Sequence, residues 1–158
     1  MAFVLAVATG CGASSAGSGE HPCTLMASPE GISIRIAPEI AKQVSDTTRV
    51  RACWAGSCHM REVRLRPDTK TKDLGCSAGV CSGKMLPAPG KGGFANLPKL
   101  PAELVRVTLT LTGSGGEPVV AETLRVVPQP TYPNGPDCGK GGPQAGLRVT
   151  STGDVREM

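Results

Sequence analysis

The sequence predicts an all-β domain, an antiparallel immunoglobulin-like sandwich of about seven short strands that follows a flexible N-terminal tether. Apolar and polar residues alternate along several short segments, which is the pattern of strands with one buried face. Turn-forming residues separate these segments, since the chain of 158 residues contains 21 glycines and 14 prolines. An up-and-down barrel is the alternative all-β architecture. Aromatic residues make up only 3 % of the chain, so the core must be aliphatic.

The first predicted strand begins after residue 30, where Ile32, Ile34 and Ile36 alternate with polar or small residues. Pro38 to Val44 predicts one or two helical turns, with proline at the first position. The next two predicted strands are Thr47 to Trp54 and Ser57 to Arg66, separated by the turn Ala55-Gly56.

One register of this hairpin gathers apolar side chains on one face and places opposite charges across from each other on the other face. If Cys53 lies opposite Cys58, one face collects the apolar side chains Val50, Ala52, Val63 and Leu65. The same register places Arg49 opposite Glu62 and predicts an ion pair there. Arg61 is the misfit on the apolar face, and we expect it near the edge of the sheet.

A second hairpin follows in the C-terminal half. Leu104 to Thr112 alternates most clearly, and Pro118 to Val127 returns after a glycine-rich turn, with Glu122 out of step with the apolar pattern. Gly146 to Ser151 is the last predicted strand. The segments Pro67 to Gly93 and Pro128 to Pro143 are interpreted as long loops, because they are rich in Gly, Pro and charged residues.

The chain contains seven cysteines, an odd number. An odd cysteine in an exported protein requires a separate role. If Cys11 carries lipid, six cysteines remain for three bridges, which are typical of oxidising compartments. Sequence proximity and flanking turn residues predict the pairs Cys53 with Cys58 and Cys76 with Cys81. The long closure is then Cys23 with Cys138.

The N-terminus supports the lipid on Cys11. Phe3 to Ala8 is a short apolar run that ends in Ala8-Thr9-Gly10-Cys11, and small residues that lead into a cysteine resemble a bacterial lipobox. We interpret residues 1–10 as a lipoprotein signal peptide shortened at its start, residues 11–22 as a flexible tether, and residues 23–158 as the β-sandwich domain. A buried strand from Ala2 to Ala8 is the alternative.

Charge and motifs bear on the function classes. The net charge of +4 comes from basic residues spread along the sequence, which favours a soluble surface over an anion-binding patch. Nucleic acid is not an expected partner, because basic and aromatic residues do not interleave. His59 is flanked by Cys58 and Met60, soft ligands that suit copper, but alternate residues of a strand point in opposite directions. No motif predicts a catalytic residue, a resident metal or a cofactor.

Several features together resemble a known type of protein. They are the lipobox, the Ser/Gly tether, the Cys23-Thr24-Leu25 opening, the hairpin with two cysteines at its tip, and the loop from Pro133 to Cys138 before a final strand. With the aromatic-poor, Gly/Pro/Ala/Arg-rich composition, they are similar to the small lipoproteins of high-GC actinobacteria. The resemblance implies surface anchoring and a β-sandwich, and it implies no catalytic residues.

The sequence therefore predicts an exported lipoprotein, held on the extracytoplasmic face of the cell membrane by lipid on Cys11. We expect a non-enzymatic binding or structural module at the cell envelope, whose partner is an envelope protein or polymer. An exported copper-binding protein is the alternative, and a copper titration separates the two.

Replacing Cys11 by serine tests the anchor. The Cys11→Ser variant should leave the membrane or fail to be processed, because the thiol that takes the lipid is gone. Detergent-phase partitioning of cell fractions measures the change. Unchanged partitioning of the variant would contradict the lipoprotein interpretation.

Overall fold

A computed structural model describes residues 23, 24, 26–77 and 79–158 of the chain. Within these residues the chain forms ten strands, one short α-helix and one 3₁₀ turn, so the all-β prediction is confirmed and the strands outnumber the seven expected. The predicted signal peptide, the tether and Cys11 lie outside the described residues. None of the described helices is long and apolar enough to cross a membrane.

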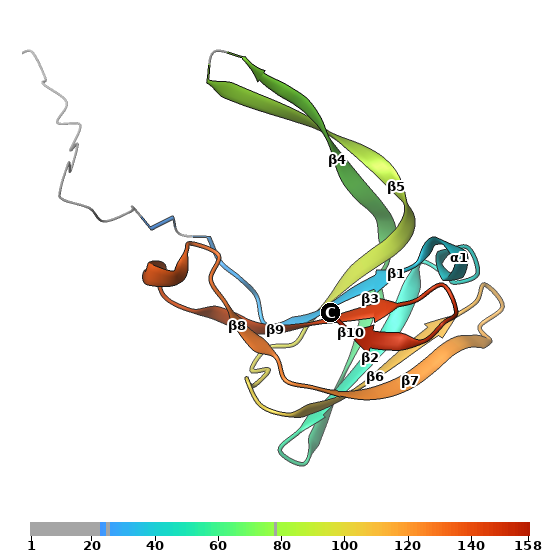
Figure 1. The fold of residues 1–158 in the computed structure, drawn as a ribbon. Coiled ribbons are helices and arrows are strands. Elements are labelled where there is room, and N and C mark those ends of the chain that lie inside the picture. Colours follow the sequence, from blue (N-terminus) through green and yellow to red (C-terminus); the bar gives the residue numbers. More distant parts are fainter. Residues whose placement is uncertain (1–22, 25, 78) are drawn as a thin grey trace, which may run out of the picture.

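The strands form two sheets (Figure 1). The first has the order β10-β9-β1-β5-β4, with β8 paired to β9. Its strands are β1 (Gly31–Ile36), β4 (Arg66–Ser77), β5 (Val80–Asn96), β8 (Gln129–Thr131), β9 (Gly141–Val149) and β10 (Val155–Glu157). The predicted antiparallel arrangement is wrong at one pair, because β1 runs parallel to β9. Two strands far apart in the sequence have no turn that would force them to be antiparallel.

The second sheet has the order β3-β2-β6-β7 and is antiparallel throughout. Its strands are β2 (Thr47–Trp54), β3 (Ser57–Arg64), β6 (Val105–Thr112) and β7 (Pro118–Val126). The β2–β3 register is the one predicted, with Cys53 opposite Cys58 and Arg49 opposite Glu62. Among the described residues, however, the only ion pair joins Lys91 to Asp46, so the predicted pair at Arg49 does not form.

A single aliphatic core lies between the two sheets. β1 contributes its three isoleucines and β6 contributes four residues, and all seven are buried: Ile32, Ile34, Ile36, Val105, Val107, Leu109 and Leu111. They occupy alternate positions, since successive side chains of a strand point to opposite faces. Helix α1 (Pro38–Ala41) begins with proline, as predicted, and adds Ile40 to the same core.

The residues that do not fit the alternation lie at the sheet edges. Arg61 lies on edge strand β3, where its side chain is exposed and donates hydrogen bonds to the carbonyl oxygens of Asn96 and Met60. On edge strand β7, Glu122 accepts a hydrogen bond from the backbone N–H of Val155, 2.5 Å away in the first sheet. Both charged groups therefore gain backbone partners without entering the core.

Both predicted long loops are partly strand. Pro67 to Gly93 forms most of the β4–β5 hairpin, and Pro128 to Pro143 contains β8, the 3₁₀ turn Pro136–Cys138 and the start of β9. Their side chains are largely exposed or half-buried, so no apolar alternation indicates the strands. Backbone pairing alone defines them. The immunoglobulin-like arrangement of the strands stays a prediction.

The three disulfides are Cys23–Cys138, Cys53–Cys58 and Cys76–Cys81, which confirms the predicted pairs. The first closes a separation of 115 residues and ties the start of the described chain to the 3₁₀ turn before β9. The other two each close a separation of 5 residues across a hairpin end.

Removal of the long bridge should cost more stability than removal of a short one. In the chain-entropy model, a Cys23→Ser/Cys138→Ser variant loses about 5 kcal/mol and a Cys53→Ser/Cys58→Ser variant about 2 kcal/mol. Urea unfolding of the two variants beside the intact chain measures the difference. Equal losses would show that the long bridge does not restrict the unfolded chain in this way.

Candidate functional site

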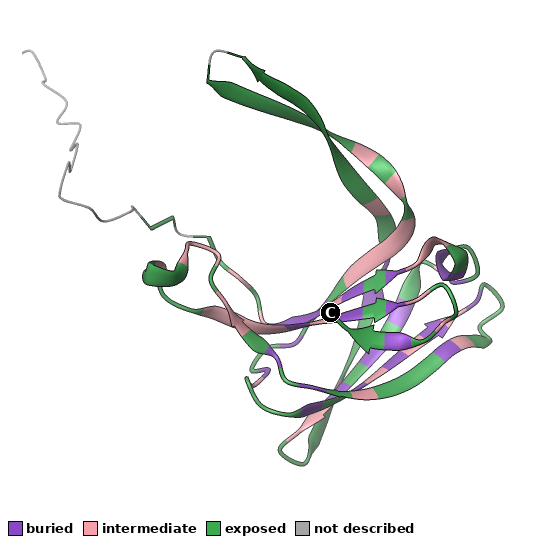
Figure 2. Cartoon of the chain, in the orientation of Figure 1, coloured by how far each residue is buried: buried purple, intermediate pink, exposed green. Residues whose placement is uncertain are grey.

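The clearest feature outside the core is an arm made by the outer parts of β4 and β5, residues 68–77 and 80–88. Figure 1 shows the arm leaving the two-sheet body and extending away from it. In Figure 2 it is coloured as exposed over nearly its whole length. The arm therefore contributes almost nothing to the core.

Backbone pairing and a disulfide hold the arm together. Its ladder runs from Asp68 opposite Ala88 to Ser77 opposite Val80, with one irregularity between Asp73 and Gly75. At that point the carboxylate of Asp73 accepts a hydrogen bond from the backbone N–H of Gly75 at 2.7 Å. The Cys76–Cys81 bridge then closes the last turn, so the two strands cannot separate at the tip.

The arm presents apolar and basic side chains to solvent. Leu74, Val80 and Met85 are 57 %, 72 % and 61 % exposed. Lys72 lies directly opposite Lys84, and neither pairs with a carboxylate in the described part of the chain. Like charges that face each other weaken a strand pair, and exposed apolar side chains gain nothing from folding. The stability of the arm therefore does not explain why these apolar and basic side chains lie on its surface.

The root of the arm is fixed to the body. Lys91 of β5 is mostly buried, forms a 2.9 Å ion pair with Asp46 and donates a 2.7 Å hydrogen bond to the carbonyl oxygen of Val44. At Gly93, an added Cβ would lie 2.7 Å from a methyl carbon of Val63 in the other sheet. Glycine at this position lets β5 pass close to β3 where it enters the body from the arm.

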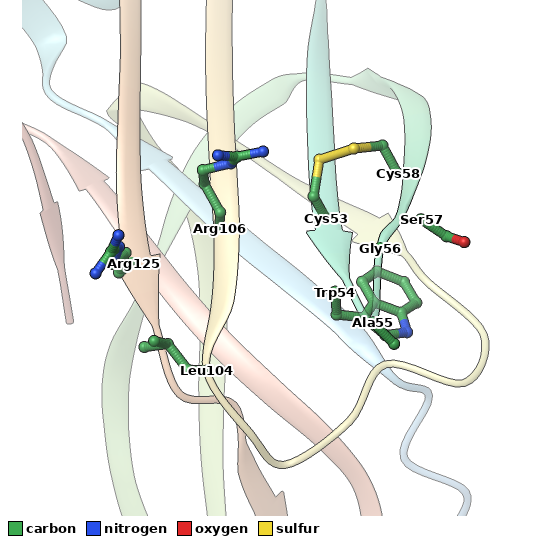
Figure 3. Close-up of a pocket in the computed structure, with 9 residues that line it drawn as sticks. All are labelled: Cys53, Trp54, Ala55, Gly56, Ser57, Cys58, Leu104, Arg106 and Arg125. Atoms are coloured by element: carbon green, nitrogen blue, oxygen red, sulfur yellow. A yellow bond between two sulfur atoms is a disulfide. The ribbon is translucent and has the colours of Figure 1, made fainter.

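A second candidate site is an open pocket of about 390 Å³ at the β2–β3 turn (Figure 3). Its lining residues include the disulfide-bonded Cys53 and Cys58, Trp54 at the turn, and Leu104, Arg106 and Arg125. The indole of Trp54 stacks on the imidazole of His59, with ring centroids 4.2 Å apart. This contact orients the indole at the end of the sheet.

The predicted copper ligands do not come together. Cys58 is half of a disulfide, Met60 is exposed, and His59 is half-buried on the other face of β3 against Trp54. The described residues contain no group of three or more His, Cys, Asp or Glu side chains that could hold a metal ion.

Sequence reasoning found all the disulfide cysteines but missed the arm and the pocket. The paired cysteines at 76 and 81, with Gly75 before them and Gly79 between them, were the available signal for a hairpin tip. The pocket had no such signal, because it combines residues of β2, β6 and β7.

Searches against protein-family models, curated proteins and solved structures gave no match. The functional interpretation therefore rests on the residues and geometry described above.

The Lys91–Asp46 pair predicts a pH effect on stability. The hydrogen bond and charge of Lys91 hold the pKa of Asp46 below its usual 3.8, and the charge of Arg64 adds to this effect. A carboxyl whose pKa is lower in the folded state stabilises the fold above its unfolded-state pKa. This contribution is lost as the pH falls through the folded-state pKa.

A Lys91→Met variant should therefore lose less unfolding free energy than the wild type between about pH 6 and about pH 3. Urea unfolding over this range measures it. Lys42→Met is the control, because Lys42 is exposed and forms no ion pair among the described residues. If unfolding of Lys91→Met depends on pH as in the wild type, Lys91 is not the group that lowers the pKa of Asp46.

Proposed function

We propose that this protein is an exported, lipid-anchored and non-enzymatic binding module of the cell envelope, and that the arm is the element that contacts its partner. The anchor is lipid on Cys11, at the extracytoplasmic face of the cell membrane. The arm stands out from the body, so it reaches beyond the surface of the domain (Figure 1).

The disulfides support export. The chain has seven cysteines, and the three bridges use every one except Cys11. Structural disulfides persist in oxidising compartments and are rare in the bacterial cytoplasm. The one cysteine outside the bridges is the residue that the lipobox assigns to lipid.

The surface of the arm is the observation that carries the binding role. Three large apolar side chains near the tip are more than half exposed, on an element that buries almost nothing. Exposed apolar groups gathered on one element are typical of protein contact sites. Because the disulfide fixes the tip before a partner arrives, binding loses less conformational entropy.

Photo-crosslinking from the arm tests this proposal. A photoreactive phenylalanine analogue at Val80 should give crosslinked adducts with an envelope component in intact cells. The same analogue at Tyr132 is the matched control, because Tyr132 is also exposed, at 46 %, but directly follows β8 on the body. We expect adducts from position 80 and few from position 132.

A second variant tests which groups bind. In Leu74→Ser/Met85→Ser the adducts from position 80 should fall several-fold, while the melting temperature should change little because both side chains are exposed. Adducts that are equally abundant from positions 80 and 132, or that persist in the double serine variant, would contradict the role of the arm.

A further inference from the structure

The outer face of the second sheet is strongly basic. The buried side chains of its strands occupy alternate positions, so the positions between them face solvent. These outward positions hold five exposed arginines from all four strands: Arg49, Arg51, Arg64, Arg106 and Arg125. The arginines are scattered along the sequence, and only strand pairing brings them onto one surface, which we term the arginine face.

The register places these arginines in neighbouring rows. In one row Arg106 lies opposite Cys53 of the Cys53–Cys58 disulfide on one side and opposite Arg125 on the other (Figure 3). In the next row Arg51 lies opposite Thr108, and Thr108 lies opposite Thr123. Side chains directly opposite on antiparallel strands have Cβ atoms about 5 Å apart. Anionic groups spaced along a chain could therefore contact several arginines at once.

Few carboxylates balance this charge. In the row of Arg49, the residue opposite it is the acidic Glu62. Asp46 lies near Arg64 but already forms an ion pair with Lys91. In the described part of the chain none of the five arginines forms an ion pair. Arg51 donates one 3.4 Å hydrogen bond to Sγ of Cys58. The arginine face thus carries guanidinium groups without a carboxylate partner, and such groups bind carboxylate or phosphate through two parallel hydrogen bonds.

The other groups on the face narrow the kind of anion. Half-buried threonines lie between the arginines, and the hydroxyls of Thr108 and Thr123 are 2.8 Å apart. Such hydroxyls can donate to and accept from sugar hydroxyls. Met60 is the only large apolar side chain in these rows, so the face lacks the apolar groups that insert into a lipid surface.

The pocket at the β2–β3 turn opens at the end of the arginine face. Arg106 and Arg125 belong to both, and Leu104 and the Cys53–Cys58 disulfide complete that part of its lining. The indole of Trp54 points to the other face of the sheet, where it stacks on His59 and packs against the core. The arginine face therefore lacks the series of aromatic platforms that single-stranded nucleic acid uses.

We infer that the arginine face and its pocket bind an acidic polysaccharide of the cell envelope. Arg106 and Arg125 would pair with its anionic groups, and the threonine hydroxyls would contact its sugars. The inference rests on the proposed envelope location, but it assigns a surface separate from the arm.

Isothermal titration calorimetry tests the inference. The purified, oxidised full chain is titrated with polygalacturonate. We expect saturable binding of polygalacturonate, weakened by added salt, and no binding of neutral dextran of similar length. No binding at low salt, or equal binding of dextran, would overturn the inference.

A charge-matched pair of variants locates the site. Arg106→Gln/Arg125→Gln should weaken binding about tenfold or more, because each guanidinium makes charged hydrogen bonds. Its melting temperature should stay level or rise, since two like charges no longer face each other. Arg35→Gln/Arg148→Gln is the control, because these exposed arginines also lie opposite each other, in the first sheet beside Arg156.

Equal weakening by both double variants would mean that only net charge attracts the polymer, and it would overturn the site. Tighter binding to phosphatidylglycerol vesicles or to oligo(dT) than to polygalacturonate would replace the polysaccharide by a membrane or a nucleic acid. These titrations do not require the lipid on Cys11, and the arginine variants leave the arm unchanged. A failed titration therefore leaves the crosslinking result from position 80 to decide the proposed function separately.

Discussion

β2 lies between β3 and β6, and its register against both neighbours constrains the second sheet. Val50 and Ala52 are fully buried, which requires their cross-strand partners on β6, Leu109 and Val107, to face the same core. A shift by one residue would turn these side chains to solvent and bury Arg51. The aliphatic core therefore fixes one register, and that register decides which residues face outward.

The exposed face of the second sheet is a consequence of this constraint. Once Val105, Val107 and Leu109 point inward, Arg106 and Thr108 must point outward, and pairing with β7 places Arg125 opposite Arg106. The core explains why these positions are exposed, but it does not explain why arginine occupies so many of them. A solvent-facing position tolerates many residue types, and arginines that face each other reduce stability. Binding is the physical reason we assign to them.

The arm is held together by different interactions from those of the body. Its strands bury little, so the backbone ladder, the Cys76–Cys81 bridge and the anchored root at Lys91 define it instead of a core. This difference explains why the register of the β2–β3 hairpin was predictable and the arm was not, although β3 ends at Arg64, two residues before the predicted Arg66. The first has an apolar pattern that selects one register, whereas in the arm both faces meet solvent and no pattern arises.

The sequence by itself determined the all-β class, the alternating strands of the core, the start of the helix at Pro38 and the three disulfide pairs, because each depends on local spacing or on cysteine count. Only the tertiary structure decided the parallel pairing of β1 with β9, the projection of the arm, the pocket and the arginine face. These features join residues from distant strands. Local patterns do not encode which strands become neighbours, since this depends on how the whole core closes.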